Sequence, residues 1–404
     1  MTVMAEPVGV AQQRMGTRAS IGRWVAIAAA GLLAACSTVI PRGPVVPAER
    51  PVAVDTRPDA VEAGIPRDTA RNRVALLVPL SGSNAGVGQS IANATMLAVL
   101  DTGTDKVRIT NYDTAGGAAA AARRAIAEGA QLILGPLLAD DVRAVAPVAR
   151  AAGVPVLSFS NDSSVAGSGA YLMGYAPTQS IERVVAYARG RGVSTFAAVV
   201  PNGVYGERAS TAFLRAVETA GGQVVSMQTY GRVAGGVAGA VSRLGAKAPY
   251  DAVLIADNGA TAAAAAPLIR RGGGGRTHIL GTELWNSEAG LAAKPALSGA
   301  WFASVSNTLY RQYATKYRTR FGTSPYRLSS LGYDAVLLTV RIARDWPVGR
   351  PFPEAKLRGA DGFAGIDGAF RFGRDGIAER ALEVQEVRGG TLVTVSPAPA
   401  GFGN

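Results

Sequence analysis

Hydrophobic and polar residues recur with two different periods from about residue 71 onward, and together they predict a repeated strand–helix unit. Short, continuous apolar runs are typical of strands that are buried on both faces. Longer segments with apolar residues every three to four positions predict amphipathic helices. Strands are expected at 74–80, 107–112, 131–135 and 154–159, and helices at 89–100, 118–128 and 140–151. This alternation predicts a parallel sheet with right-handed crossovers.

The same unit restarts near residue 180 and predicts a second α/β lobe. Its expected helices span 180–189, 205–220 and 260–271, and its expected strands span 195–200, 223–229, 251–256 and 278–281. Two more helices at 306–321 and 326–344 and strand-like segments at 369–372 and 382–387 follow. The predicted fold class is α/β with two lobes, each a mostly parallel sheet flanked by helices. We expect lobe 1 at about 71–176 plus 305–345, lobe 2 at about 177–304, and bridging strands within 362–395.

The first 70 residues have a different pattern, which predicts a secretory signal and a tether. Arg14, Arg18 and Arg23 precede an apolar run at 24–35, which is shorter than the about 20 residues that a membrane-spanning helix needs. Residues 1–35 are therefore predicted to be a signal peptide. Prolines recur from Pro41 onward and block regular structure, so residues 36–70 are expected to form a semi-extended tether.

The end of the apolar run, Leu33-Ala34-Ala35-Cys36, resembles a bacterial lipobox. That resemblance implies that Cys36 is acylated and becomes the first residue of the mature protein; the alternative is a core cysteine in an alanine-rich helix. Ser37 follows instead of an aspartate, which implies an outer-membrane lipoprotein on the periplasmic face. Each buried acyl methylene contributes about 0.8 kcal/mol, so several chains anchor durably. Because the segment before Cys36 is unusually long, we expect translation to start at Met15 and not at Met1.

The composition argues against catalysis and against most metal chemistry. The 404 residues include one cysteine and one histidine, His278, which excludes an intramolecular disulfide and a zinc site of the usual Cys/His kind. His278 has no Gly-x-Ser-x-Gly motif to pair with, and no Gly-Lys-Ser/Thr sequence follows the glycines at 82, 86 and 88. We expect no catalytic residue, no metal and no cofactor.

The net charge changes the list of candidate partners only slightly. A formal charge of +12 and a pI near 10.1 favour acidic partners such as nucleic acid, anionic lipid or an anionic wall polymer. The basic residues are scattered singly, however, with no block of five or more. Since nucleic-acid binding needs a concentrated basic face, we expect no nucleic-acid partner.

Polar, glycine-rich loops follow the predicted strands, and they supply the candidate ligand contacts. In open parallel sheets, ligands bind beyond the carboxyl ends of the strands. The candidates in these loops are Ser81, Asn84, Ser160, Asn161, Tyr205 and Glu283. Ser81 and Asn84 either donate to an anionic ligand at a helix N-terminus or serve ordinary turn and capping roles.

Several segments resemble, in order and spacing, the type I periplasmic solute-binding fold of the leucine-binding kind over about residues 71–395. The resemblance is carried by residues 75–82, 133–137, 153–158, 205–206, 333–335 and 362–372. It implies that Tyr205 stacks on a ligand and Glu283 binds its amino group; otherwise Tyr205 packs at a helix start and Glu283 is solvated. The turn that supplies hydroxyls in amino-acid receptors reads Leu138-Ala139-Asp140 here, which argues against amino-acid capture in the usual pose.

Together with the lipobox, three further segments are similar to the penicillin-binding protein activator lipoproteins. These are residues 135–138, 158–162 and 281–285. The resemblance implies a non-catalytic, lipid-anchored periplasmic regulator that binds and stimulates a peptidoglycan synthase. The proline-rich tether stands where longer members carry a helical-repeat domain. The alternative is a solute-binding receptor for an amino acid or a similar small ligand.

Overall fold

The computed structural model of the protein describes residues 70–245, 249–272, 276–288, 290–399 and 401–402. The chain divides into two units, Met1–Ile65 and Pro66–Asn404, and the described residues belong to the second. The predicted signal peptide, Cys36 and nearly all of the predicted tether lie outside the described residues. Their predictions therefore rest on the sequence.

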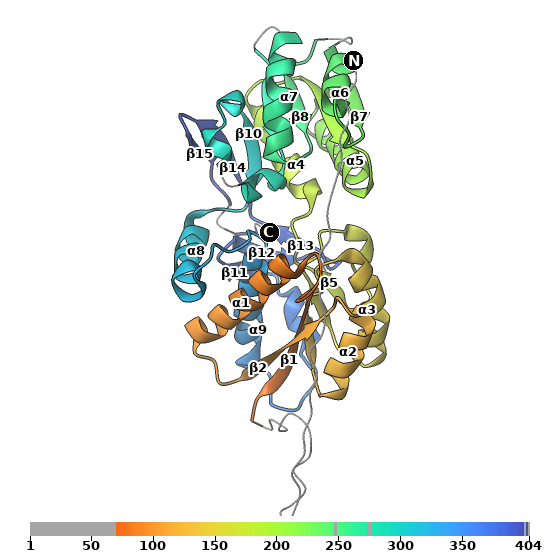
Figure 1. Ribbon diagram of the computed structural model, residues 1–404, viewed down its shortest axis with the longest axis vertical. Coiled ribbons are helices and arrows are strands. Elements are labelled where there is room, and N and C mark those ends of the chain that lie inside the picture. Colours follow the sequence, from red (N-terminus) through yellow and green to blue (C-terminus); the bar gives the residue numbers. More distant parts are fainter. Residues whose placement is uncertain (1–69, 246–248, 273–275, 289, 400, 403–404) are drawn as a thin grey trace, which may run out of the picture. The chain divides into compact units, whose positions relative to one another are not determined.

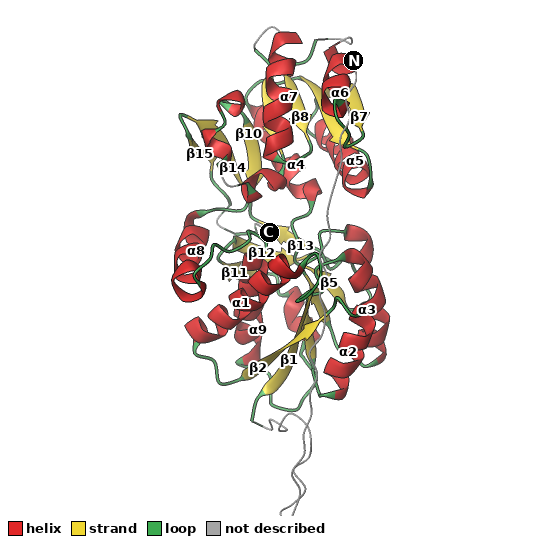
Figure 2. Ribbon diagram, viewed as in Figure 1, coloured by secondary structure: helices red, strands yellow, loops and turns green. Residues whose placement is uncertain are grey.

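The first part of the described chain is a five-stranded parallel sheet with the strand order β2-β1-β3-β4-β5 (Figures 1 and 2). Its strands are β1 (Asn72–Val78), β2 (Val107–Asp113), β3 (Leu132–Leu134), β4 (Val156–Ser158) and β5 (Ala170–Leu172). The continuous apolar run of β1 occupies a central position, where Leu76 pairs with Asn111 on one side and with Leu134 on the other. A strand enclosed on all sides needs apolar residues on both faces.

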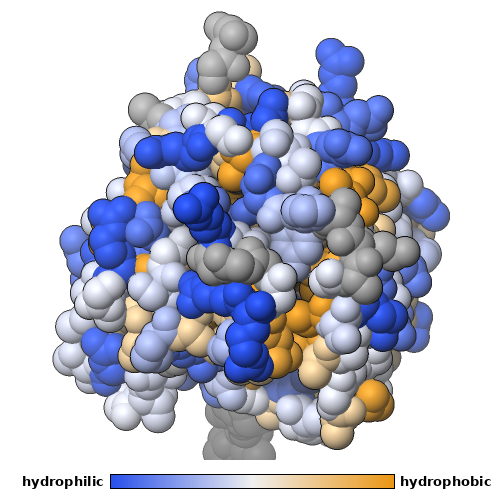
Figure 3. All heavy atoms as spheres, turned by 90° about the horizontal axis from the view of Figure 1, so that it is seen from above, coloured by the Kyte–Doolittle hydropathy of each residue, from blue (hydrophilic) through white to orange (hydrophobic). Residues whose placement is uncertain are grey.

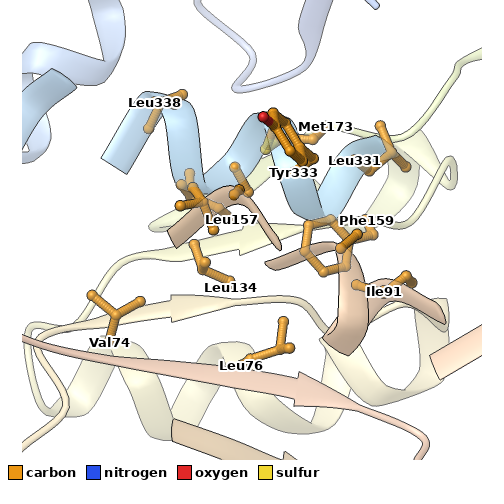
Figure 4. Packing of buried hydrophobic residues seen from close by; sticks show 14 of the residues in the cluster. Val74, Leu76, Ile91, Leu134, Leu157, Phe159, Met173, Leu331, Tyr333 and Leu338 are labelled. Carbon is orange, nitrogen blue, oxygen red and sulfur yellow. The ribbon is translucent and has the colours of Figure 1, made fainter. Parts of the chain in front are cut away.

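Helices cover both faces of this sheet. They are α1 (Ala85–Thr102), α2 (Ala118–Ala127), α3 (Ala139–Ala151), α8 (Thr308–Phe321) and α9 (Ser329–Ala343). Side chains of α1, α8 and α9 pack on one face, and those of α2 and α3 pack on the other. In Figure 4, Leu134 and Leu157 point from the strands toward the helix that carries Tyr333 and Leu338. The late helices thus complete the core that the N-terminal strands begin.

The second part is a seven-stranded sheet with the order β15-β14-β10-β9-β8-β6-β7. Its strands are β6 (Thr195–Pro201), β7 (Gln223–Tyr230), β8 (Ala252–Ile255), β9 (His278–Gly281), β10 (Trp301–Ser304), β14 (Glu383–Arg388) and β15 (Thr391–Ser396). The strand pairs are parallel except for the two that β14 makes, with β10 and with β15, which are antiparallel. One face packs on α4 (Pro177–Gly190) and α5 (Val204–Thr219), and the other on α6 (Gly236–Gly245) and α7 (Gly259–Gly272).

The chain passes between the two sheets three times. These passages lead from β5 to α4, from β10 to α8, and from the short sheet β11–β13 to β14. The short sheet consists of β11 (Phe363–Gly365), β12 (Gly368–Phe372) and β13 (Ala378–Arg380). The passages bring residues that are distant in sequence to one place, and the candidate site lies there.

The predicted α/β fold class with mostly parallel sheets is confirmed, but several short elements were not predicted. β5 has three residues and follows glycines with positive φ at 167 and 169. α6 carries glycines at 236, 239 and 245, and glycine is about 1 kcal/mol less favourable than alanine within a helix. In both places packing against neighbours stabilises an element that local sequence preference does not indicate.

Candidate functional site

Two neighbouring cavities are lined by segments from both parts of the described chain. The first of them, called the tyrosine cavity, has a volume of about 290 Å³. Its lining includes Leu138, Ser160, Asn161, Asp162, Tyr205 and Arg208. The arginine cavity has about 20 Å³, and its lining includes Tyr175, Gln179, Glu283, Ser304, Arg327 and Arg380. A hydrogen bond from Tyr205 to Glu283 joins the two linings.

Tyr205 is fixed by the start of α5 on one side and by the end of β9 on the other. The next residue, Gly206, lies so close to β6 that a Cβ there would come within 1.6 Å of the Pro201 carbonyl oxygen. This tight approach sets the first turn of α5. The Tyr205 hydroxyl lies 3.0 Å from Thr282 Oγ1 and donates to Glu283 Oε1, also at 3.0 Å. Burial and the neighbouring Glu283 carboxylate raise the pKa of Tyr205 well above its usual value, so its hydroxyl stays protonated.

Glu283 is a buried carboxyl and not a solvated one. It opens the short helix Glu283–Ser287 directly after β9, and it is 8% exposed. Ser180 of α4 donates to Oε2 and Tyr205 of α5 donates to Oε1. Burial raises the pKa of Glu283 to about 6, although these hydrogen bonds oppose the increase. Glu283 is thus held in one orientation at the border of the arginine cavity.

Ser160 and Asn161 lie in the loop after β4 and line the tyrosine cavity with Tyr205. Ser160 is buried and its hydroxyl accepts a hydrogen bond from the Asp162 backbone N–H at 3.1 Å, whereas Asn161 is exposed. Asp162 forms an ion pair with Arg208 of α5 and another with Arg143 of α3 at 3.1 Å. The Arg208 pair joins the first part of the chain to the second across this cavity.

Ser81 and Asn84 lie elsewhere. Both are exposed, and neither is among the residues that line the two cavities. The Ser81 hydroxyl donates to Asp113 Oδ2 at 2.6 Å, and this bond lowers the pKa of Asp113. Asn84 precedes α1 without a side-chain capping bond. The structure therefore brings together four of the six predicted contacts and leaves these two apart.

Arg327 and Arg380 were not singled out by the sequence analysis. Arg327 lies just before α9 and Arg380 ends β13, and both line the arginine cavity. They are 7% and 8% exposed. Arginines are rarely buried without a partner, so a buried pair beside a cavity is informative. No local motif marks them, because only the three chain passages bring them together.

A group of acidic side chains lies behind these arginines. Asp367 Oδ1 is 2.8 Å from Arg327 Nη1, and Asp367 also accepts hydrogen bonds from Tyr175 and Ser330. Asp334 of α9 accepts a hydrogen bond from the Ile366 backbone N–H at 2.7 Å. Burial and the nearby Asp367 raise the pKa of Asp334 far above its usual range. Asp334 thus has a structural, hydrogen-bonding position.

The described residues hold neither a candidate metal cluster nor a membrane-spanning helix. Among them, no three His, Cys, Asp or Glu side chains group closely enough to hold a metal ion. None of the helices within the described ranges combines the length and hydropathy needed to cross a bilayer. His278 stacks on Trp301 with ring centroids 4.3 Å apart.

Residues 72–391 match the family model described as periplasmic binding protein. This chain belongs to the periplasmic binding protein family. Membership implies a periplasmic location and a solute-binding type of protein, and the match covers the first sheet, the second sheet up to the start of β15, and both cavities. An uncharacterized protein of Rickettsia prowazekii is 26% identical over 139 residues, which span 34% of this chain and 37% of that relative.

Solved structures of periplasmic binding proteins of the leucine-binding type share the fold. A leucine-binding protein LivK of Thermotoga maritima has a TM-score of 0.62 at 20% identity and covers 81% of this chain and 98% of its own. A putative branched-chain amino acid ABC transporter from Rhodospirillum rubrum has a TM-score of 0.71 at 21% identity and covers 80% and 100%. A solute-binding protein from R. palustris in complex with benzoate has a TM-score of 0.62 at 18% identity and covers 83% and 98%.

Proposed function

We propose that this periplasmic binding protein is a non-catalytic solute receptor that holds a small organic ligand against Glu283 and Tyr205. The observation that carries the proposal is the Glu283 carboxyl, which is buried at the border of the arginine cavity and oriented by Ser180 and Tyr205. A buried, oriented carboxyl beside a cavity with a raised pKa is typical of a binding site. Proteins of the same fold have been solved as a leucine-binding protein and in complex with benzoate.

The proposed contacts follow from the two linings. Glu283 accepts a hydrogen bond or ion pair from an ammonium or hydroxyl group, and the ring of Tyr205 stacks on an apolar part of the ligand. Ser160 and Asn161 contact the part that occupies the tyrosine cavity. The predicted roles of Ser81 and Asn84 rest on the sequence alone.

A ligand panel tests this proposal through the unfolding temperature. A ligand that binds only the folded state stabilises it by about 2.7 kcal/mol at one hundred times its dissociation constant. We expect at least one compound among amino acids, hydroxy acids and benzoates to raise the unfolding temperature of the wild-type protein. The same compound should have a smaller effect on Glu283→Gln and on Tyr205→Ala, which removes the ring.

The matched control is Glu218→Gln, an exposed position at the end of α5, which should respond like the wild type. If no compound in the panel changes the unfolding temperature of the wild type, the receptor proposal is wrong.

A second candidate is the lipid-anchored activator of a peptidoglycan synthase. Two observations favour it: the arginine cavity has about 20 Å³ of open space, and the turn at Leu138 presents no hydroxyl to the tyrosine cavity. On the face shown in Figure 3, hydrophobic residues form separate patches between hydrophilic ones, so a partner there would meet a mixed surface. An unchanged glycan polymerisation rate, with no binding to purified synthases, would exclude this candidate. The outer-membrane anchor at Cys36 remains a prediction.

A further inference from the structure

We propose that Arg327 and Arg380 form a carboxylate-binding subsite in the arginine cavity, so that the ligand is a small organic acid carrying a hydrogen-bond donor at its other end. This inference rests on the proposed receptor function and names the ligand class for that site. In this site the two arginines take the place of the hydroxyl groups that are missing from the turn at Leu138.

The contacts of Arg327 leave one edge of its guanidinium group without a partner. Nη1 lies 2.8 Å from Asp367 Oδ1 and donates to Ser330 Oγ at 2.8 Å, and the group stacks 4.0 Å above the ring of Tyr310. Nε and Nη2 are buried and have no hydrogen-bond partner among the described residues. These two nitrogens share the edge on which arginine binds a carboxylate with two parallel hydrogen bonds.

Arg380 presents a similar deficit beside the same cavity. Its Nη2 donates to the Met173 carbonyl oxygen at 2.5 Å, and its guanidinium lies 5.0 Å from the ring centre of Tyr175. Nε and Nη1 are buried without a hydrogen-bond partner within the described ranges. An unsatisfied buried donor that carries charge costs more free energy than a neutral one. Two such side chains at one cavity therefore favour an anion that satisfies both.

The charges around the cavity support the same ligand class. Two guanidinium groups face one ion-pair partner, Asp367, since the raised pKa of Asp334 favours its neutral form. The guanidinium of Arg380 therefore remains available to pair with a ligand carboxylate. Glu283 also lines this cavity, so a ligand with two anionic ends would be repelled. An amino acid or a hydroxy acid places its carboxylate at the arginines and its donor at Glu283.

The size of the cavity indicates how the ligand must enter. About 20 Å³ is the space for one or two water molecules, which is too little for a whole solute. The cavity is lined by segments from both sheets. Arg327 precedes α9, which packs on the first sheet, and Glu283 and Ser304 belong to the second sheet and its loops. A whole solute therefore requires the two linings to move apart, as in the hinge closure known for binding proteins.

Calorimetric titration with matched acids and amides tests the subsite. The probes are L-leucine against L-leucinamide, and 4-hydroxybenzoate against 4-hydroxybenzamide, because each pair differs only at the carboxylate. For an acid that binds the wild type, we expect the amide to bind at least about tenfold more weakly. Arg327→Lys keeps the charge opposite Asp367 but removes the two-nitrogen edge, and should weaken acid binding at least about tenfold with little effect on the amide.

Arg380→Lys serves as the second variant, because Arg380 is not part of the Asp367 pair, and Arg320→Lys on the exposed side of α8 is the matched control. Circular dichroism verifies that each variant is folded. Equal binding of acid and amide, or unchanged acid binding in both cavity variants, would overturn the subsite while leaving the receptor function intact. If neither member of either pair binds the wild type, the carboxylate subsite proposal is wrong. The receptor function is then tested separately by the broader ligand panel.

Discussion

At the scale of single residues, the buried Glu283 is the feature that sets the chemistry of the site. The family resemblance indicated the residue, but its burial and its Ser180 partner come from α4, about a hundred positions away. Arg327 and Arg380 were not predictable, because an isolated arginine in a sequence is nearly always solvated. A local sequence pattern cannot show that Arg380 at the end of β13 and Arg327 before α9 line the same cavity.

The raised pKa of Glu283 predicts a pH-dependent stability. In the unfolded chain Glu283 loses its proton near pH 4.5, and in the folded protein near pH 6. Between these values the folded state binds more protons, so the free energy of unfolding falls as the pH rises and levels off above pH 6. The shift corresponds to about 2 kcal/mol.

Glu283→Gln cannot titrate and should lack this fall. Urea unfolding from pH 4 to 7 measures it: the stability of the wild type relative to Glu283→Gln should decrease with pH, whereas the wild type and Glu218→Gln should follow parallel curves. A constant difference between the wild type and Glu283→Gln would show that Glu283 titrates normally.

At the scale of elements, the strand–helix alternation predicted most of the fold because each long element has its own periodicity. Short elements such as β5 and the glycine-rich α6 depend on their neighbours, and their sequences alone do not indicate them. The two sheets also share a close contact between a helix glycine and the preceding strand, which the sequence patterns did not show. Gly88 in α1 and Gly206 in α5 both approach the carbonyl oxygen of the proline near the preceding strand end, Pro79 and Pro201.

This close approach makes the start of α5 sensitive to a single methyl group. A Cβ at Gly206 would lie 1.6 Å from a backbone oxygen, so Gly206→Ala must displace the helix from β6 and should destabilise the protein by about 1–3 kcal/mol. It should also weaken ligand binding, since Tyr205 moves with the helix. Gly190→Ala in α4 is the control, because no atom lies within 4 Å of its Cβ, and it should be neutral or stabilising in thermal unfolding. Equal effects of the two substitutions would contradict the packing argument.

At the scale of the whole described chain, the ion pair between Asp162 and Arg208 links the two sheets. Its side chains are 12% and 23% exposed, so solvent screens it less than a surface pair. A double-mutant cycle with Asp162→Asn and Arg208→Gln should give a coupling energy of about 0.5–3 kcal/mol in urea unfolding. The exposed pair Asp345 and Lys356 provides the control cycle, which should give about 0.5 kcal/mol or less. Equal and small coupling energies in the two cycles would mean that the ion pair between Asp162 and Arg208 does not stabilise the folded protein.

The central claim is that this periplasmic binding protein holds a small ligand against the buried Glu283 carboxyl. Titration calorimetry of the wild type and of Glu283→Gln, with the compound that stabilises the wild type most, tests it directly. The account predicts saturable binding to the wild type at one site and at least about tenfold weaker binding to the variant. Equal affinity for both proteins would show that the ligand binds elsewhere and would contradict the account.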